Sequence, residues 1–203
     1  MTDSDATRRF FDAIASRYER VYARPTEELR EHMTRVLDLL GPPRDVLDLG
    51  VGPGPELHHL LDAGHRVVGV DISPSMIALC NARARQIRCV CTDFWSVLPL
   101  DDASFDAVIA LYGSLAHSPR VGARVDLAHE VDRVLRPGGV FYAEVPAPAW
   151  AAEHGTFEDA VTHSRIDIDS VSVAAWRAAF EGCLDVSVTE QGSELCIVAR
   201  KRR

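Results

Sequence analysis

Short apolar segments alternate with longer amphipathic segments through the middle of the chain. The apolar segments are rich in β-branched residues and are bounded by glycine, proline or aspartate, which is typical of buried strands. The segments between them carry apolar residues at helical spacing. Strands that alternate with helices predict a parallel sheet covered on both faces. We expect strands at 45–49, 65–70, 87–91, 105–111 and 140–145, and helices at 56–63, 74–85 and 120–134.

The two ends of the chain extend this alternating core. Residues 10–22 and 29–40 carry apolar side chains at helical spacing, which predicts two helices before the first strand. A helix at 171–180 is followed by two short strands, 184–189 and 195–199, and their short link predicts an antiparallel hairpin. The predicted fold class is α/β: a Rossmann-like three-layer α/β/α sandwich whose mostly parallel seven-stranded sheet ends in a C-terminal antiparallel hairpin.

Length and composition fit a single globular domain without a membrane segment. The chain has 203 residues, of which 47% are hydrophobic and 26% charged. No apolar run approaches the roughly 20 residues that span a bilayer, and residues 1–9 lack an apolar signal region. We therefore expect a cytoplasmic protein with no membrane partner. Its expected parts are a helical cap at 1–40, a cofactor-binding core at 41–146, a small substrate lid at 147–170, and a helix with the closing hairpin at 171–203.

The net charge argues against a nucleic-acid partner, and the cysteines argue against a disulfide framework and a zinc site. The net charge is −8, from 22 basic and 30 acidic residues, and an acidic surface repels nucleic acid unless its basic residues cluster. The one dense basic run, 200–203, is expected to be a solvated tail. Five cysteines without a C-x-x-C pair suggest neither a disulfide framework nor a zinc site. Cys89 and Cys91 are expected on one face of a strand, where cysteine behaves as a small hydrophobic residue.

The candidate chemistry starts in the loop after the first expected strand. Residues 46–54 read Val-Leu-Asp-Leu-Gly-Val-Gly-Pro-Gly, with glycines at alternate positions. Glycine permits a positive φ and lets a ligand approach the main chain where a Cβ would clash. The helix expected next would present backbone N–H groups to whatever lies in the loop. The pattern predicts a cradle for a nucleotide-like cofactor.

The spacing of these glycines argues against two common nucleotide sites. The dinucleotide pattern G-x-G-x-x-G/A requires glycine or alanine at position 55, where this chain has proline. The Gly-Lys-Ser/Thr ending of a P-loop is also missing, so no lysine is placed for a triphosphate. An NAD(P)-dependent oxidoreductase is therefore a disfavoured alternative.

The loop resembles motif I of the class I S-adenosylmethionine-dependent methyltransferases, and other segments resemble later motifs of that family in order. Residues 69–73 (Gly-Val-Asp-Ile-Ser) resemble the acidic end of the family's second strand, and 91–94 (Cys-Thr-Asp-Phe) the end of the third. Residues 104–109 resemble its fourth strand, and 133–139 the turn before the fifth. The resemblance is close over residues 10 to 146. Within the family, the chain most resembles the branch that methylates small molecules. It implies S-adenosylmethionine as cofactor, with S-adenosylhomocysteine as product.

Two acids at strand ends are the expected contacts for the nucleoside. Asp71 ends the second expected strand, where a carboxylate can accept hydrogen bonds from both ribose hydroxyls; alternatively, it is an acid at a helix start. By resemblance, Asp93 accepts the adenine amino group, and the alternative is a solvated turn acid. Ile72 and Phe94 would then flank the adenine ring as an apolar slot.

The methionine end is assigned mainly by resemblance. Asp48 lies among apolar residues, where an unpaired carboxylate would be costly; the family places this acid beneath the methionine end, although a purely structural role is nearly as well supported. The loop glycines Gly50, Gly52 and Gly54 would contact the methionine part through the backbone. Tyr18, followed by Glu19, resembles a tyrosine–acid pair that helps close the cofactor pocket, and packing in the core is the alternative.

Methyl transfer requires that nucleophile, carbon and sulfur be held in line, and a general base only when the acceptor must lose a proton. The family has no fixed catalytic residue, so candidates come from the loop after the fourth strand. His117 could act as the base, or be a capping or surface histidine. Tyr112 could hydrogen-bond the acceptor, or simply pack. The lid carries aromatic and histidine side chains that suit a small organic acceptor: Trp150, His154, Phe157 and His163.

These expectations define an enzyme that transfers the methyl group of S-adenosylmethionine to a small molecule. The main alternative is a catalytically silent S-adenosylmethionine-binding regulatory or partner protein. The sequence leaves open the acceptor, whether O, N, S or C is methylated, and whether two copies pair as a homodimer.

Overall fold

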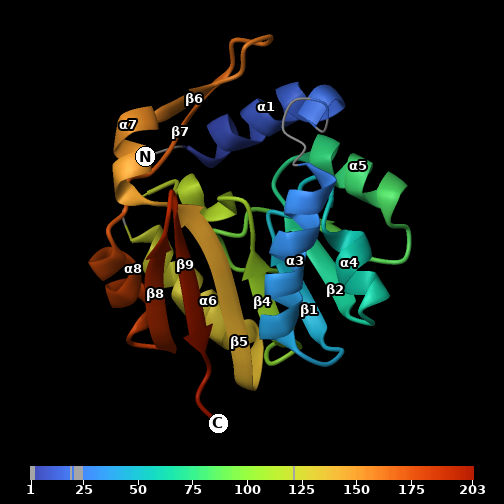
Figure 1. Cartoon of the computed structure of the whole chain (residues 1–203), viewed down its shortest axis with the longest axis vertical. Coiled ribbons are helices and arrows are strands. Elements are labelled where there is room, and N and C mark those ends of the chain that lie inside the picture. Colours follow the sequence, from blue (N-terminus) through green and yellow to red (C-terminus); the bar gives the residue numbers. More distant parts are fainter. Residues whose placement is uncertain (1–2, 19, 21–24, 121) are drawn as a thin grey trace.

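A seven-stranded sheet forms the centre of the molecule (Figure 1). The computed structural model describes residues 3–18, 20, 25–120 and 122–203. The strand order is β3-β2-β1-β4-β5-β9-β8; the first five strands are parallel, and β9 pairs antiparallel with β5 and β8. The predicted fold class and the antiparallel hairpin are thus confirmed. The strands are β1 (Asp45–Leu49), β2 (Arg66–Asp71), β3 (Arg88–Cys91), β4 (Phe105–Ala110), β5 (Leu135–Pro146), β8 (Asp185–Gln191) and β9 (Glu194–Arg200).

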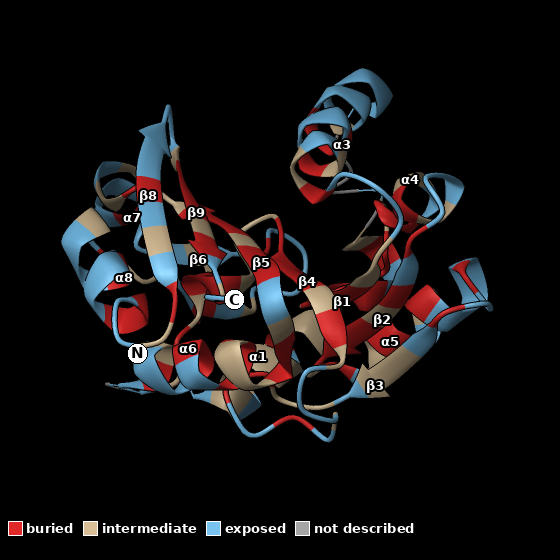
Figure 2. Ribbon diagram, turned by 90° about the horizontal axis from the view of Figure 1, so that it is seen from below, coloured by how far each residue is buried: buried red, intermediate tan, exposed pale blue. Residues whose placement is uncertain are grey.

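Helices cover both faces of this sheet because its central strands carry apolar side chains on both sides. Leu47 on β1 belongs to the apolar cluster beneath α6 and α8, and its neighbour Val46 belongs to the cluster beneath α3, α4 and α5. Figure 2 shows buried residues along β1, β4 and β5. Because Asp48 alternates with Leu47, it shares the α4 face with Val46. The helices are α3 (Thr26–Leu40), α4 (Leu57–Asp62), α5 (Pro74–Arg83), α6 (Ala123–Val134) and α8 (Val173–Phe180).

The N-terminal segment differs from the predicted helix at 10–22. Helix α1 (Ser4–Ile14) begins earlier, because the side chain of Asp3 caps it by accepting the N–H of Asp5. It ends at Ile14 in a short 3₁₀ helix, η1 (Ala15–Arg17). Glu19, Val21 and Tyr22 of the prediction lie outside the described residues. Helix α1 contacts α5, and Asp12 accepts bonds from Ser73 Oγ and the N–H of Ser75 at 2.6 and 3.2 Å.

The expected lid has more regular structure than its sequence suggested. Helix α7 (Pro148–His154) leads into a small antiparallel sheet of β6 (Thr156–Glu158) and β7 (Arg165–Asp167). This hairpin lies beside α1 in Figure 1, and β7 contacts α1. Its attachment includes a buried ion pair between Arg17 of η1 and Asp159, which follows β6. The lid and the N-terminal cap are therefore packed together over one edge of the sheet.

Strand boundaries around the site also differ from the prediction. Strand β4 ends at Ala110, and Leu111 already belongs to the following turn. Strand β5 begins at Leu135 and runs through Pro137-Gly138-Gly139, with an irregularity in its pairing to β4 between Phe105 and Ala107. Cys91 is exposed on the edge strand β3 and does not pack in the core.

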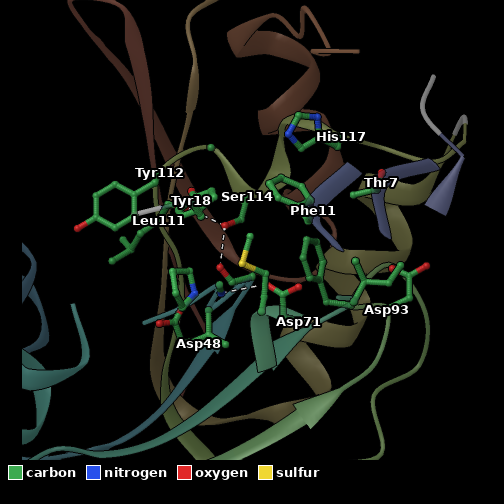
Figure 3. A pocket seen from close by; sticks show the side chains of 18 of the residues that line it. Thr7, Phe11, Tyr18, Asp48, Asp71, Asp93, Leu111, Tyr112, Ser114 and His117 are labelled. Carbon is green, nitrogen blue, oxygen red and sulfur yellow. Dashed lines mark hydrogen bonds between the residues drawn. The ribbon is translucent and has the colours of Figure 1, made fainter. Parts of the chain in front are cut away.

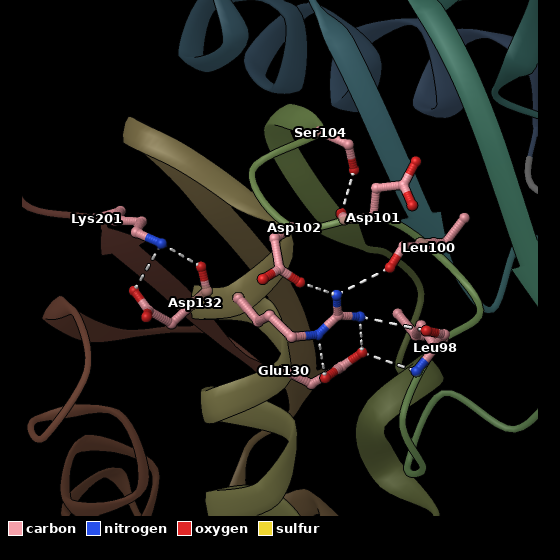
Figure 4. Close-up of polar contacts among 9 residues, drawn as sticks. Leu98, Leu100, Asp101, Asp102, Ser104, Glu130, Asp132 and Lys201 are labelled. Atoms are coloured by element: carbon pink, nitrogen blue, oxygen red, sulfur yellow. Dashed lines mark hydrogen bonds and ion pairs between the residues drawn. The ribbon is translucent and has the colours of Figure 1, made fainter.

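Polar contacts of α6 hold the loop between β3 and β4, which follows the predicted adenine contact (Figure 4). Arg133 donates to the carbonyl oxygens of Leu98 and Leu100 at 3.2 and 2.9 Å, and Glu130 accepts the N–H of Leu98 at 2.7 Å. The C-terminal tail is also held rather than freely solvated, since Lys201 Nζ donates to the carbonyl oxygen of Asp132 at 2.6 Å. Lys201 therefore anchors the end of the chain against α6, while the other residues of the basic run, Arg200, Arg202 and Arg203, are exposed as expected.

Candidate functional site

A cavity opens where the carboxyl ends of β1, β2, β3 and β4 meet α1, and it has a volume of about 870 Å³ including its mouth. Ligands of open α/β sheets bind at this end of the strands. Figure 3 shows Asp48 and Asp71 on one side of the cavity and His117 on the opposite side. Of the predicted site residues, the cavity is lined by Tyr18, Asp48, Gly50, Gly52, Asp71, Ile72, Asp93, Phe94, Tyr112 and His117.

The three loop glycines have different reasons to be glycine. All three have positive φ, between 51° and 80°. A Cβ on Gly50 would lie 2.5 Å from Ser114 Oγ, and one on Gly54 would lie 2.3 Å from a Leu57 methyl. A Cβ on Gly52 would meet only the Gly50 carbonyl oxygen, at 4.0 Å. Gly50 and Gly54 thus permit close packing, whereas Gly52 leaves open space beside a cavity that a ligand can fill.

Asp71 fixes this loop to the end of β2. Its Oδ2 accepts the N–H of Gly52 at 2.9 Å, and its Oδ1 accepts the N–H of Ser73 at 2.8 Å. Burial raises the pKa of Asp71 to about 6, although both backbone bonds favour the ionised form. Each carboxylate oxygen keeps acceptor capacity beyond one bond. The carboxylate can therefore hold the loop and still accept hydroxyl groups from a ligand.

Two further buried carboxyls, those of Asp48 and Glu56, lie beneath the loop. Asp48 and Glu56 are each 2% exposed, and both line the cavity. Asp48 Oδ2 and Glu56 Oε1 receive no bond from any donor that the structure describes. Burial raises the pKa of Asp48 to about 7 and raises that of Glu56 well above its usual range. Three buried carboxyls would repel the pyrophosphate of a dinucleotide, so the site favours a cationic or neutral group here.

The other end of the cavity suits a flat base. Asp93 Oδ1 accepts the N–H of Trp95 at 2.9 Å, and its Oδ2 accepts the hydroxyl of Ser4 on α1 at 2.6 Å. Ile72 and Phe94, which directly follow Asp71 and Asp93 in the sequence, also line the cavity. An apolar slot with one carboxylate at its edge can recognise an aromatic ring that carries an amino group.

His117 is oriented by the lid. Its Nδ1 lies 2.8 Å from the carbonyl oxygen of Asp167 on β7, so Nδ1 must carry the donated proton. Burial lowers the pKa of His117, and the bond to Asp167 opposes part of that effect. The neutral ring then has its lone pair on Nε2. Phe11 packs edge-on against the ring, with centroids 5.9 Å apart. A neutral histidine in this tautomer can accept a proton from a ligand in the cavity.

Tyr112 contributes to the wall, but its hydroxyl has partners elsewhere. The residue has φ of 55°, which is unusual for a side chain of this size. Its hydroxyl lies 3.2 Å from His32 Nδ1 on α3, and His32 Nε2 lies 2.6 Å from Glu144 Oε1 on β5. Figure 3 shows the Tyr112 hydroxyl pointing away from the other labelled side chains. Of the two predicted catalytic candidates, His117 is better placed to reach a ligand.

The predicted lid residues lie outside the cavity. Trp150 and His154 stack on each other with centroids 4.1 Å apart, and His163 is exposed beside Glu158. Phe157 packs edge-on against Phe10 of α1, 5.9 Å away. The lid therefore contributes to the site through Asp167, which orients His117, and not through its aromatic side chains.

Several lining residues were missed by sequence reasoning. Glu56 was taken only as the first residue of the helix expected at 56–63. The hydroxyls and aromatic rings that reach the cavity from α1 and other loops depend on tertiary packing, which no local pattern signals. The missed residues include Ser4, Thr7, Phe11, Glu56, Met76, Trp95 and Ser114.

Comparisons with known proteins agree with this geometry. Residues 46–139 match the family model described as a methyltransferase domain. A demethylmenaquinone methyltransferase of Beutenbergia cavernae is 37% identical over 147 residues, which are 70% of this chain and 58% of the relative. The ubiquinone/menaquinone biosynthesis C-methyltransferase UbiE of Rubrivivax gelatinosus is 32% identical over 148 residues, which are 70% of this chain and 57% of that relative. This chain thus spans less than two thirds of either relative.

A solved structure shares the whole fold. The complex of DhpI with SAH superposes with a TM-score of 0.78 and 21% identity, and the match covers 98% of this chain and 97% of that chain. Among the described residues, no helix is long and apolar enough to cross a membrane. The matched domain, the strand order and the ordered motifs are together similar to those of the class I S-adenosylmethionine-dependent methyltransferases.

Proposed function

We propose that this chain binds S-adenosylmethionine in the cavity and transfers its methyl group to a small-molecule acceptor. The observation that carries this proposal is one cavity that joins a cation-favouring glycine loop, an apolar slot for a base, and a neutral histidine on the opposite side. The relatives named as menaquinone methyltransferases act on small molecules by name, which supports the same acceptor class.

The residues present fit this cofactor. The open space beside Gly52 and the buried oxygens of Asp48 and Glu56 without donors suit a ligand that approaches the main chain with a positive group. Asp71 would hold the ribose, Asp93 the adenine amino group, and Ile72 with Phe94 the faces of the ring. The loop glycines, with Asp48 beneath them, would hold the methionine end. The cofactor supplies a methyl group on a positively charged sulfur, which is already activated for transfer.

The protein's own contribution is positioning and proton removal. Phe11 of helix α1 and Tyr18, which follows η1, line the cavity, and the N-terminal segment thereby limits the entry of water. For an acceptor that must lose a proton, Nε2 of His117 accepts it, and the Asp167 carbonyl stabilises the ring in that orientation. Tyr112 shapes the wall beside the acceptor. The short lid leaves room for a small acceptor, whereas a polymer would have to displace the α1–lid contact.

Calorimetry with S-adenosylhomocysteine and with NAD(P) tests the cofactor. Micromolar binding of S-adenosylhomocysteine without NAD(P) binding is the expected result, and the reverse would contradict the proposal. A screen of hydroxylated aromatic and quinone-type acceptors, read as S-adenosylhomocysteine formed, separates an enzyme from a catalytically silent binder. The homodimer and the cytoplasmic location remain predictions, and light scattering tests the dimer.

A further inference from the structure

Three carboxyl groups lie at the end of the cavity that we assign to the methionine part of the cofactor, and nearby positive charges do not balance them. Asp48 comes from β1, Glu56 from the residue before α4, and Asp71 from the end of β2, and all three are buried. Burial opposes ionisation of Asp48 and Glu56 and raises the pKa of each; the charge of Asp71 adds to this at Asp48, and that of Asp48 adds to it at Glu56. An uncompensated buried charge is costly, so the site needs either a bound proton or a cationic ligand.

The titratable groups that surround this pair from the packed elements are acids and thiols. Asp71 acts on Asp48 from β2, while Cys80 of α5 and Cys89 of β3 respond to the charge of Asp48. Beyond Asp71, Asp12 of α1 adds a further negative charge. The cation on that side is Arg8 of α1, which is already paired with Asp12 and Asp5. No described cation acts on the Asp48–Glu56 pair.

The two carboxyls face the same cavity. Asp48 Oδ2 and Glu56 Oε1 are both buried without a donor among the described residues, and two carboxyl groups so placed can hydrogen-bond each other only when a proton lies between them. Close acid pairs of this kind keep one proton over a wide pH range because both cannot ionise together. Asp48 and Glu56 are therefore placed as two acids that can share one proton next to a ligand site.

We propose that Glu56 makes cofactor binding proton-linked: the Asp48–Glu56 pair keeps one proton in the cofactor-free protein and releases it to solvent when the ammonium group of the cofactor's methionine part enters. The inference rests on the proposed function and deepens it. The O–H bond of the protonated carboxyl breaks, the proton goes to water, and the resulting carboxylate pairs with the ammonium. Charge is conserved, and no other reactant is needed.

This exchange determines which ligands the methionine end accepts. A ligand with an ammonium group replaces the proton, whereas one that lacks it leaves the proton in place. The affinity for S-adenosylhomocysteine should rise with pH, up to about tenfold between pH 6 and pH 7 if one proton is released. The affinity for 5′-methylthioadenosine, which keeps the nucleoside and thioether but has no amino acid, should stay nearly constant over the same range.

Titration calorimetry at pH 6.5, in buffers of different ionisation enthalpy, counts the protons. We expect release of between about one half and one proton per S-adenosylhomocysteine bound, and close to none for 5′-methylthioadenosine. In Glu56→Gln the amide donates to Asp48, which removes the need for a shared proton, so release should disappear. Glu153→Gln, an exposed glutamate on α7, is the matched control and should release as many protons as the wild type.

The outcomes separate this inference from the proposed function. Binding of S-adenosylhomocysteine without proton release, or equal release by Glu56→Gln and the wild type, would overturn the role of Glu56 and leave the methyltransferase proposal intact. If S-adenosylhomocysteine does not bind at all, the proposed function fails and this inference fails with it. Should Glu56→Gln not fold, the comparison of the two ligands on the wild-type protein decides alone.

Discussion

The Nδ1 atom of His117 lies 2.8 Å from the backbone carbonyl oxygen of Asp167, which joins the loop after β4 to the lid strand β7. The bond is supported by two neighbours: the N–H of Asp169 donates to the carbonyl oxygen of Ala116, and the Asp169 carboxylate accepts the N–H of Ser118. The lid therefore determines both the tautomer and the direction of the histidine ring. The acceptor is a neutral backbone group, and the nearby carboxylates of Asp169 and Asp167 also favour the protonated ring.

Replacing His117 tests its role as a base. For an acceptor that must lose a proton, His117→Asn should lower kcat by roughly 10²- to 10⁴-fold, with little effect on the dissociation constant of S-adenosylhomocysteine. Because burial lowers the pKa of His117, the ring is neutral at pH 7, and kcat should decline only as the pH falls below the ordinary histidine range. Kinetic pH profiles of both proteins measure this.

His154 provides the matched control for that experiment. Its Nδ1 also bonds a backbone carbonyl, that of Trp150 at 2.9 Å, but the side chain is exposed and lies outside the cavity. His154→Asn should keep kcat and the pH profile of the wild type. Equal losses in both variants would mean that neither histidine acts as the base and that both substitutions only disturb the fold.

Asp71→Asn should weaken cofactor binding. Asp71 accepts two backbone N–H groups that shape the loop, and an asparagine must turn its NH₂ group toward one of them. Loss of such buried bonds costs roughly 1–3 kcal/mol, so we expect the dissociation constant for S-adenosylhomocysteine to rise by about 5- to 150-fold. Calorimetry measures it, with the exposed Asp62→Asn of α4 as control. An unchanged affinity would remove Asp71 from the site.

Sequence patterns predicted the parts of this site that depend on local geometry. The strand ends, the glycine spacing and the acids at 48, 71 and 93 are all determined within a few residues of chain, and the structure brings them to one cavity. Glu56 was missed because its sequence context is that of a helix start, while its role depends on the neighbouring strand β1. The aromatic lid residues were assigned to substrate, yet Phe157 packs on Phe10 because the hairpin docks against α1. Such docking is a long-range contact, and local periodicity carries no signal for it.

The Arg17–Asp159 ion pair should stabilise the closed arrangement of cap and lid. The two side chains are 9% and 0% exposed, and Asp159 also accepts the N–H groups of Val161 and Thr162. Removing one partner leaves a buried charge, so Arg17→Met and Asp159→Asn should each lower the free energy of unfolding by roughly 3–5 kcal/mol. A double-mutant cycle from urea unfolding should give a coupling of at least about 1 kcal/mol between them.

The neighbouring pair Arg165–Glu158 is the control for that cycle. Its side chains are 70% and 39% exposed, and exposed pairs contribute about 0–1 kcal/mol. We expect a coupling of only a few tenths of a kcal/mol for Arg165→Met with Glu158→Gln. Similar couplings for the two pairs would show that the buried contact does not fasten the lid.

The difference in stability between Asp48→Asn and the wild type should grow as the pH rises. Burial raises the pKa of Asp48 in the folded protein to about 7, whereas the unfolded chain has the ordinary value. The folded state therefore holds this proton more tightly, and the contribution of Asp48 to stability falls as the pH rises from about 4 to 7. Asparagine cannot ionise, so the variant should gain stability relative to the wild type at pH 8 by up to roughly 4 kcal/mol, and much less at pH 5.

Urea unfolding of the cofactor-free proteins at both pH values measures this difference. The exposed Asp101→Asn is the control, and its stability should equal that of the wild type at both pH values. A gain that is the same at pH 5 and pH 8 would mean that Asp48 is ionised in the folded protein throughout, and that any proton of the pair is held by Glu56 alone.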